Sequence, residues 1–167
     1  DDLRSYSIFG DVEIYAEQMV SKAIRSRMPY CFSESKYEGI PRIHMNEVEP
    51  GNSFSIGDIK ITPLRVMHGK LPILGYKLND VAYITDMSLA PETLFEQLKG
   101  VEVLIVNALR QKKHITHQSL DEALSFAYRI QAEKTYLIHM SHQMGLHKDI
   151  ENSLPKNVFL AYDNLEI

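Results

Sequence analysis

The N-terminal part of the chain combines one alternating stretch with one stretch of helical periodicity. Residues 12–16 alternate between apolar and polar side chains, which is typical of a strand, whereas residues 17–28 carry apolar side chains at helical spacing. Pro29 follows and is expected to end that helix. The next segment, 33–41, is polar and contains a glycine, so it is predicted to be a solvated loop.

Residues 42–86 are predicted to form a series of antiparallel strands. Strand-like segments in this region are separated by Gly-Asp at 57–58 and Asn-Asp at 79–80, as they would be by hairpin turns. Pro63 interrupts one of these strands. Because proline cannot donate a hydrogen bond to a neighbouring strand, an edge position or a bulge is expected there.

After Asp86 the pattern changes to alternating strands and helices, which is the signature of α/β layering. The first strand of this half is apolar enough to be buried on both faces. A capping box begins a helix at Ser119, and Tyr128 falls on the apolar stripe of that helix. The elements expected here are strands at 101–106, 135–138 and 158–161 and helices at 91–99, 119–130 and 146–153. Because all linkers are short, residues 1–167 are predicted to form a single α/β domain.

Composition and charge narrow the functional classes. The 167 residues are 44% hydrophobic and 24% charged, which is ordinary for a globular domain, and the net charge of −4 argues against non-specific binding of long nucleic acids. No apolar leader or long apolar run is visible, so neither a signal peptide nor a membrane helix is expected. The single cysteine, Cys31, rules out an internal disulfide and favours a reducing, cytoplasmic location.

Three apolar segments end abruptly in side chains that can ligate a metal, namely His68, Asp86 and His139. A buried strand that stops on such a residue places it at the rim of a sheet, where loops can close a site around it. On its own, His68 is equally consistent with a hydrogen-bonded core histidine, and Asp86 with an Asx turn or a helix cap. A carboxylate directly after a buried strand, however, needs a cation or several donors to compensate its burial.

Polar residues near these strand ends are candidates for supporting roles. His142 follows His139 by three positions and is expected to orient it. His117 precedes the capping box, where the partial positive charge of a helix N-terminus disfavours imidazolium and attracts anions. Arg110 and Lys113 precede it on the same loop and could hold a substrate phosphate or carboxylate, although such a run is also typical of a solvated surface.

Several other kinds of active site find no support in the sequence. It contains no glycine-rich phosphate loop, no Gly-x-Ser-x-Gly elbow and no paired-cysteine metal motif. A cysteine–histidine catalytic pair would have to use Cys31, and nothing in the sequence near Cys31 supports one.

The order of the candidate motifs resembles the metallo-β-lactamase superfamily. From residue 59 onwards a strand ends at His68-Gly69, a hairpin leads to Tyr83-Ile84-Thr85-Asp86, and His117-Gln118-Ser119 and Leu137-Ile138-His139 follow. The chain is most similar to a phosphodiesterase-like branch that holds phosphoribosyl cyclic phosphate phosphodiesterase, pyrroloquinoline quinone biosynthesis protein B and the tRNA 3′-processing endonuclease. The resemblance implies an α/β fold of the αββα four-layer sandwich type, with residues 162–167 as its closing strand.

The same resemblance implies a metal-dependent hydrolase with two divalent ions, Zn or Mn. His68 would ligate one ion, Asp86 would bridge both, and His139 would ligate the second. His117 matches an additional histidine of the branch, which acts as a general acid or stabilises charge at the phosphate. The implied reaction is attack of metal-activated water on a small phosphodiester or cyclic phosphate.

One part of the superfamily pattern is absent from the sequence. The His-x-His-x-Asp-His segment, which supplies most of the metal ligands, does not occur in the 167 residues, so the chain resembles a hydrolase domain that starts after that segment. Residues 1–167 alone are therefore expected to be inactive and to hold no metal by themselves. Their uncovered sheet edge could pair with a second copy in a homodimer.

Three alternatives to a phosphodiesterase stay open at this point. The chain could be a non-catalytic remnant of the fold that binds a ligand or a partner, and the metal content of the full-length protein would separate that case from a hydrolase. An RNA-processing nuclease is disfavoured by the acidic charge balance. A role like that of pyrroloquinoline quinone biosynthesis protein B is the third.

Overall fold

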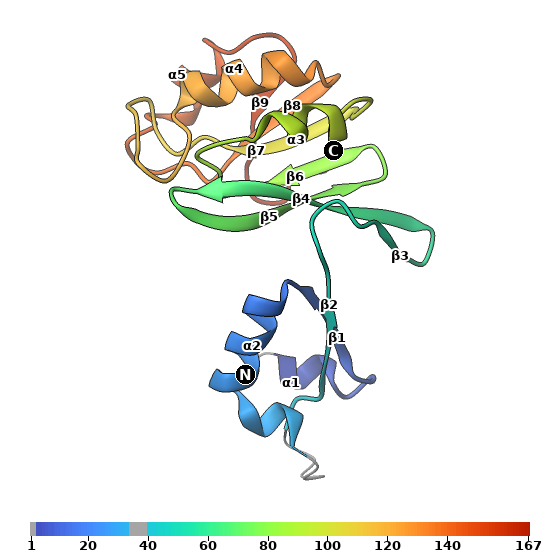
Figure 1. The fold of residues 1–167 in the computed structure, drawn as a ribbon. Coiled ribbons are helices and arrows are strands. Elements are labelled where there is room, and N and C mark those ends of the chain that lie inside the picture. The colour runs from blue at the N-terminus through green and yellow to red at the C-terminus, as the bar shows by residue number, and fades with distance from the viewer. Residues whose placement is uncertain (1–2, 34–39) are drawn as a thin grey trace. The chain divides into compact units, whose positions relative to one another are not determined.

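A computed structural model describes residues 3–33 and 40–167 and divides the chain into two compact units, Asp1–Glu49 and Pro50–Ile167 (Figure 1). Each unit has its own apolar cluster and is described by itself. The single domain predicted over 1–167 therefore stays a prediction. Most of the loop predicted at 33–41 lies outside the described residues.

The N-terminal unit is built on a pair of parallel strands. Its elements are α1 (Leu3–Tyr6), β1 (Val12–Ala16), α2 (Gln18–Arg27), the 3₁₀ helix η1 (Pro29–Phe32) and β2 (Ile43–Glu47). The strand and helix predicted on either side of residue 17 are confirmed. The prediction that all strands from 42 to 86 are antiparallel is wrong for β2, which pairs in parallel with β1. The physical reason is the helical crossover, which returns the chain to the sheet in its original direction.

The C-terminal unit contains a seven-stranded sheet in the order β3-β4-β5-β6-β7-β8-β9. Its strands are β3 (Phe54–Ile56), β4 (Ile59–His68), β5 (Leu71–Leu78), β6 (Val81–Ile84), β7 (Val103–Asn107), β8 (Lys134–Ile138) and β9 (Val158–Leu160). Both predicted hairpin turns are confirmed, since β3 pairs antiparallel with β4 and β5 with β6. Pro63 faces Tyr76 across β4 and β5, beyond the short stretch of β4 that pairs with β3, and so has the predicted edge position.

Strand direction brings several strand ends to one rim of this sheet. β4 and β6 both run antiparallel to β5 and therefore point the same way. The strands β7, β8 and β9 continue from β6 in parallel. The carboxyl ends of β4, β6, β7, β8 and β9 consequently lie on the same side, which is where open α/β sheets bind ligands.

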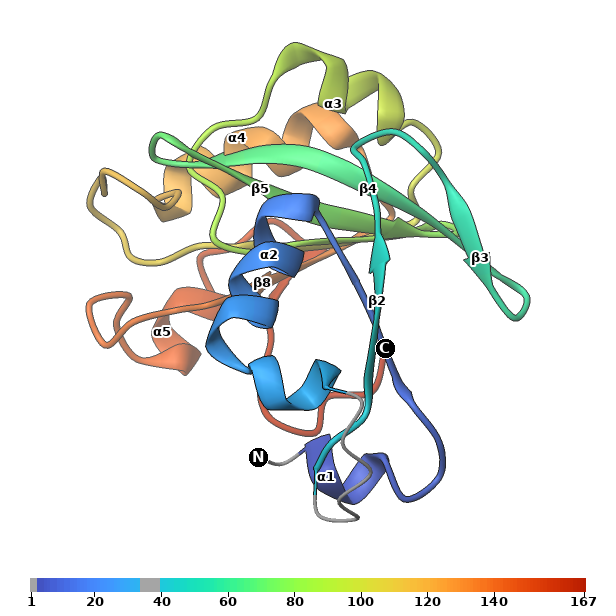
Figure 2. The same cartoon turned by 60° about the horizontal axis from the view of Figure 1, so that its bottom comes forward.

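Three helices cover the sheet: α3 (Glu92–Gln97), α4 (Leu120–Ile130) and α5 (His147–Glu151). Figures 1 and 2 show α3 and α4 over the same face. Their buried residues join the inward side chains of β4, β6, β7, β8 and β9 in one apolar cluster. Ser119 forms the predicted capping box with Glu122, which fixes where α4 begins.

Three details of the sequence-based prediction are wrong. The strand at 103–107 alternates between buried and half-buried positions instead of being buried on both faces. Tyr128 is 78% exposed, and Phe126 takes the inward position on α4. Residues 162–167 form a turn closed by a hydrogen bond from the Leu165 amide to the Tyr162 carbonyl, and not a closing strand. Within 3–33 and 40–167, no helix is both long and apolar enough to cross a membrane.

Candidate metal centre

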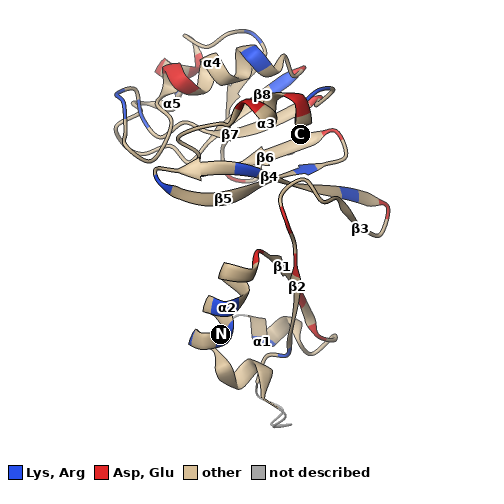
Figure 3. Ribbon diagram, viewed as in Figure 1, with Lys and Arg blue, Asp and Glu red and all other residues tan. Residues whose placement is uncertain are grey.

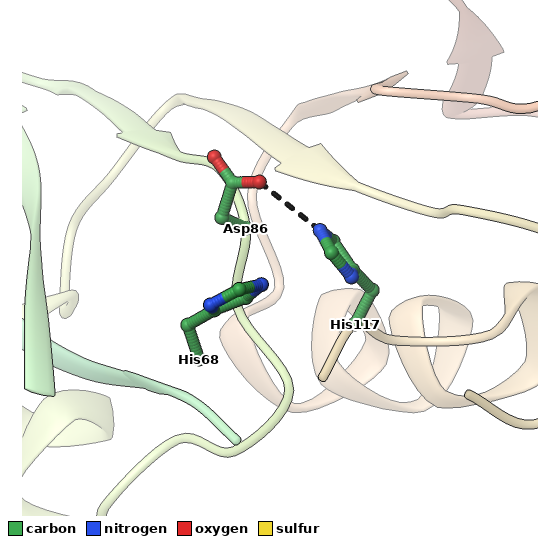
Figure 4. A group of neighbouring side chains, drawn as sticks. All are labelled: His68, Asp86 and His117. Carbon is green, nitrogen blue, oxygen red and sulfur yellow. Dashed lines mark hydrogen bonds and ion pairs between the residues drawn. The ribbon is translucent and has the colours of Figure 1, made fainter. Parts of the chain in front are cut away.

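Four of the predicted site residues meet at the rim formed by the strand ends. His68 is the last residue of β4, Asp86 follows β6 by two residues, and His139 directly follows β8. His117 reaches the same place from the loop between β7 and α4. Figure 4 shows His68, Asp86 and His117 pointing toward one another.

The carboxylate of Asp86 lies at the centre of this group. Its Oδ1 is 3.0 Å from Nε2 of His117 and 3.4 Å from Nε2 of His139. The His117 ring stacks on that of His139 with centroids 5.0 Å apart and meets the edge of the His68 ring at 4.7 Å. His117 is 13% exposed, whereas Asp86 is 41% exposed. The carboxylate is therefore open to solvent on one side and lined by imidazoles on the other.

The backbone turns sharply at two of the four residues. Asp86 has φ 57° and His139 has φ 60°, both in the left-handed region that residues other than glycine rarely adopt. Such conformations cost free energy and concentrate at functional sites. Each of these residues lies within two positions of the end of its strand, so the chain leaves the sheet with the side chain at the rim.

A buried asparagine fixes the turn that carries Asp86. Asn107, the last residue of β7, is fully buried, and its side-chain Oδ1 accepts from the Met87 amide at 2.8 Å. Its Nδ2 donates to the Met87 carbonyl at 2.9 Å. The backbone amide of Gln118 donates to the same Met87 carbonyl. This bond joins the loop of His117 to the loop of Asp86. Two neighbouring rim loops are thereby held in one arrangement.

We expect Asn107→Leu to destabilise the protein by roughly 3 kcal/mol, because both backbone groups of the buried Met87 lose their side-chain partner. The measurement is the free energy of unfolding in urea. Asn152 follows α5 and is exposed, so Asn152→Leu is the matched control and should change stability by less than about 0.5 kcal/mol. Equal effects of the two substitutions would exclude the anchoring role of Asn107.

Ser88 ties the end of β4 to the turn after β6. Its Oγ donates to the Met67 carbonyl and accepts from the Gly69 amide, both at 2.9 Å. Gly69 follows His68 with φ 61°, and a Cβ there would lie 3.1 Å from Cγ2 of Thr116. The backbone next to His68 is thus fixed on two sides.

The second nitrogen of His117 also has partners. Its Nδ1 lies 2.9 Å from Oγ1 of Thr116 and 3.3 Å from Nδ1 of His114. Desolvation lowers the pKa of His114, and the positive charges of Arg110 and of a protonated His117 lower it further. The lowered pKa favours the neutral form of His114, which can share a hydrogen bond with His117.

Three other predicted residues have different surroundings from those expected. His142 is exposed, and among the described residues no hydrogen bond joins it to His139. The guanidinium of Arg110 donates to the carbonyls of Lys112 and Lys113 and to Oε1 of Gln143, so it braces its own loop. Lys113 is exposed, with its ammonium 3.8 Å from a Glu122 carboxylate oxygen. Their proposed contact with a substrate anion stays a prediction.

The donor set fits a divalent metal ion. One ligand atom from each of His68, Asp86 and His117 lies within 4.8 Å of the others. Imidazole nitrogens with a carboxylate oxygen are the usual ligands of catalytic zinc. His139 lies 3.4 Å from the same carboxylate, stacks on the ring of His117 and adds a further nitrogen. The arrangement could hold a cation with His68 and Asp86, and a second with Asp86 and His139.

The residues that fix these side chains were not recognised from the sequence. Asn107 ends a strand just as Asp86 and His139 follow theirs, so the rule that found those two could have found it as well. Ser88 acts through contacts with residues far along the chain, and Thr116 acts through the side chain of its neighbour His117. No sequence pattern marks either residue.

Known families and proteins are similar to this chain in sequence. The family described as the Beta-lactamase superfamily domain matches residues 1–140. A protein of Porphyromonas gingivalis named octanoyltransferase is 39% identical over 167 residues, which cover 99% of this chain and 34% of that protein. The chain thus spans about a third of the length of that relative.

Several solved structures are similar to this chain in fold. A crystal structure described as a new diphosphatase from the PhnP family is 31% identical, with a TM-score of 0.83 over 93% of this chain and 57% of that chain. Zn²⁺-bound PqqB from Methylobacterium extorquens has a TM-score of 0.75 at 10% identity, over 98% of this chain and 67% of that one. The short form of human tRNase Z has a TM-score of 0.67 at 18% identity, over 93% of this chain and 65% of that chain. At these identities the last two establish the fold alone.

Proposed function

Because this chain belongs to the β-lactamase superfamily, we propose that it supplies part of the active site of a metal-dependent hydrolase that cleaves a small phosphodiester. The fold has the metallo-β-lactamase architecture predicted from the sequence. The observation that carries the proposal is the convergence of His68, His117 and His139 on the carboxylate of Asp86.

The proposed roles follow from the position of each side chain. His68, Asp86 and His139 would hold two divalent ions, with the two carboxylate oxygens of Asp86 available to bridge them. Ions bound there would supply Lewis acidity to the phosphoryl oxygens and lower the pKa of a water molecule. The further ligands that a two-metal site needs are not among these four residues. We therefore propose turnover only for the complete gene product.

His117 is proposed to act as a general acid that donates a proton to the leaving group. In hydrolysis the oxygen of water forms a bond to phosphorus, and the phosphorus–oxygen bond to the leaving group breaks. The departing alkoxide then needs a proton, and Nε2 of His117 faces the open carboxylate at the centre of the site. Thr116 would keep the ring in place through Nδ1.

A small substrate is favoured over a long nucleic acid by charge. The net charge is −4, and the guanidinium of Arg110 is engaged within the protein. A second candidate is the cleavage of a diphosphate, because the 31%-identical structure is described as a diphosphatase. We propose no transferase activity for this chain, because it matches the relative named octanoyltransferase over only 34% of that protein's length.

The test is a substrate panel with the complete gene product, loaded in turn with Zn²⁺ and Mn²⁺. The panel contains a five-membered cyclic phosphodiester, bis(p-nitrophenyl) phosphate, a dinucleoside diphosphate and a precursor tRNA. The proposal predicts metal-dependent turnover of one of the first two substrates. Turnover of the diphosphate alone would select the second candidate, and tRNA cleavage alone would select RNA processing. Failure to bind metal at all would identify a non-catalytic remnant.

We expect Thr116→Val to lower kcat by about tenfold and to leave the metal content unchanged, because the isosteric valine removes only the oxygen next to Nδ1 of His117. Thr116→Ser keeps the hydroxyl and should retain most of the rate. Steady-state kinetics combined with metal analysis makes the comparison. A serine variant as slow as the valine variant would show that the Thr116 methyl group, packed near Gly69, matters and the hydroxyl does not.

A further inference from the structure

His114 lies beside the proposed general acid, His117, on the loop between β7 and α4. The two rings have their centroids 5.2 Å apart, with their planes tilted by 53°. Nδ1 of His114 lies 3.3 Å from each of three atoms, namely the backbone nitrogen of Thr116, the hydroxyl oxygen of Thr116 and Nδ1 of His117. Whether this nitrogen donates or accepts a hydrogen bond therefore affects both neighbours.

The backbone amide of Thr116 fixes the role of this nitrogen. An amide N–H can only donate, and that of Thr116 donates to Nδ1 of His114. A proton on Nδ1 of His114 would place two N–H groups face to face. Nδ1 of His114 therefore carries a lone pair and accepts. A local bond from a backbone amide to a polar side chain two residues earlier is the same kind of contact that stabilises Asx turns.

The lone pair of His114 also orients the hydroxyl of Thr116. That hydroxyl lies between the two rings, 3.3 Å from Nδ1 of His114 and 2.9 Å from Nδ1 of His117. Because the first of these nitrogens accepts, the hydroxyl donates to it and its oxygen is left to accept from His117. A bare Nδ1 of His117 would face the lone pair of His114 at 3.3 Å, which also favours a proton on His117. The hydrogen bonds thus run from His117 through Thr116 to His114.

The side chain of Thr116 is held in the orientation that this chain of hydrogen bonds needs. Its Cγ2 methyl group lies against Gly69, where an added Cβ would come within 3.1 Å of it. The hydroxyl on the same carbon faces the two histidines. The loop before Thr116 is braced by the guanidinium of Arg110, which donates to the carbonyls of Lys112 and Lys113. The geometry of the three residues is therefore fixed by contacts outside them.

The charges of the loop favour an accepting, neutral ring at position 114. Figure 3 shows basic residues on the loop that leads into α4. Desolvation lowers the pKa of His114, and the positive charges of Arg110 and of a protonated His117 contribute to the same shift. The ring of His114 can accordingly stay an acceptor while that of His117 is charged.

We propose that His114 is a positioning residue, which ends the chain of hydrogen bonds as an acceptor and thereby keeps a proton on Nδ1 of His117. Nε2 of His117, which faces Asp86 (Figure 4), is then the nitrogen that exchanges a proton with the site. The His117 imidazolium gives its Nε2 proton to the oxygen of the leaving group and stays behind as a neutral ring with the Nδ1 proton. The effect on rate rests on the proposed hydrolase function, whereas the position of the proton does not.

The position of the proton is measured by ¹⁵N nuclear magnetic resonance of the histidine rings in the zinc-loaded complete gene product. At a pH where the ring of His117 is neutral, we expect its proton on Nδ1, with the resonance assigned by its absence in His117→Gln. In His114→Leu the acceptor at the end of the chain is missing, so the preference for Nδ1 over Nε2 should be lost.

The effect on rate is measured by steady-state kinetics with saturating metal. His114→Leu should lower kcat about tenfold and leave KM unchanged, because the ring of His117 keeps its place but loses its oriented partner. His114→Asn keeps an acceptor near the position of Nδ1 and should retain most of the rate. His147→Leu is the matched control, because His147 begins α5 and pairs with Glu151 instead, and it should leave kcat unchanged.

A double variant separates one chain of hydrogen bonds from two unrelated effects. Thr116→Val and His114→Leu break the same chain, so together they should lower kcat no further than the tenfold of either alone. Independent effects would multiply to about a hundredfold.

Three results would each overturn the proposal: a bare Nδ1 on neutral His117 in the unchanged protein, His114→Asn as slow as His114→Leu, and a double variant about a hundredfold slower. An unchanged ring spectrum in His114→Leu would overturn it as well. Absence of hydrolysis across the whole substrate panel would instead overturn the proposed function, and the ring spectra would still decide where the proton lies.

Discussion

Asp86→Ala in the complete gene product is expected to abolish both metal retention and hydrolysis. Asp86 is the carboxylate on which the imidazoles of His117 and His139 converge, at 3.0 and 3.4 Å. Without the Asp86 carboxylate, a cation near His68, His117 and His139 would have imidazole ligands but no anionic ligand. Because the substitution removes a residue proposed to bind the metal directly, metal affinity should fall by more than the 10- to 100-fold that is typical when a residue that only orients a ligand is changed.

Metal analysis after dialysis and the turnover of a small phosphodiester are the two measurements. Asp58 lies in the turn between β3 and β4, is exposed, and provides the control as Asp58→Ala, which should keep both metal and activity. Asp86→Asn refines the experiment by keeping the shape and removing the charge. Full metal occupancy in Asp86→Ala would rule out Asp86 as a bridging ligand.

His117→Ala is expected to retain the metal ions and to lower kcat by roughly 10²–10⁴-fold, the usual contribution of a general acid. The reason is its position, with Nε2 facing Asp86 and Nδ1 held by Thr116, so that the ring is oriented and can carry a proton. The rate loss should be smallest for substrates with an acidic leaving group such as p-nitrophenol, which departs without a proton.

The structure also raises a competing role for His117. With His68 and Asp86 it forms a group whose ligand atoms lie within 4.8 Å of one another, so it could itself bind the metal. The two roles differ in metal content. If His117→Ala loses metal as completely as Asp86→Ala does, His117 is a ligand and the general-acid role is excluded.

The positions of the strand ends could be predicted because they follow from local pattern. Apolar runs that stop at His68, Asp86 and His139 determine where each strand leaves the sheet, and turn residues between them set the antiparallel order. Parallel strands then bring their carboxyl ends to one rim. The convergence of these three residues therefore follows from a few local features of the sequence.

Other parts of the site depend on long-range contacts that no local pattern encodes. The hydrogen bonds between Asn107 and Met87 join the end of β7 to the turn after β6, and the approach of His117 to Asp86 joins two rim loops. His142 lies four residues after the end of β8 and is exposed, so its predicted role in orienting His139 stays a prediction. The apolar stripe of α4 was misassigned at Tyr128, where an aromatic side chain reaches solvent.

The most direct measurement is anomalous diffraction at the zinc or manganese absorption edge from crystals of the complete, metal-loaded gene product. We predict two anomalous peaks on either side of the Asp86 carboxylate, one within bonding distance of His68 and the other of His139. Peaks that lie away from these side chains, or no peak at the rim in metal-saturated crystals, would contradict the assignment of this cluster as a metal centre.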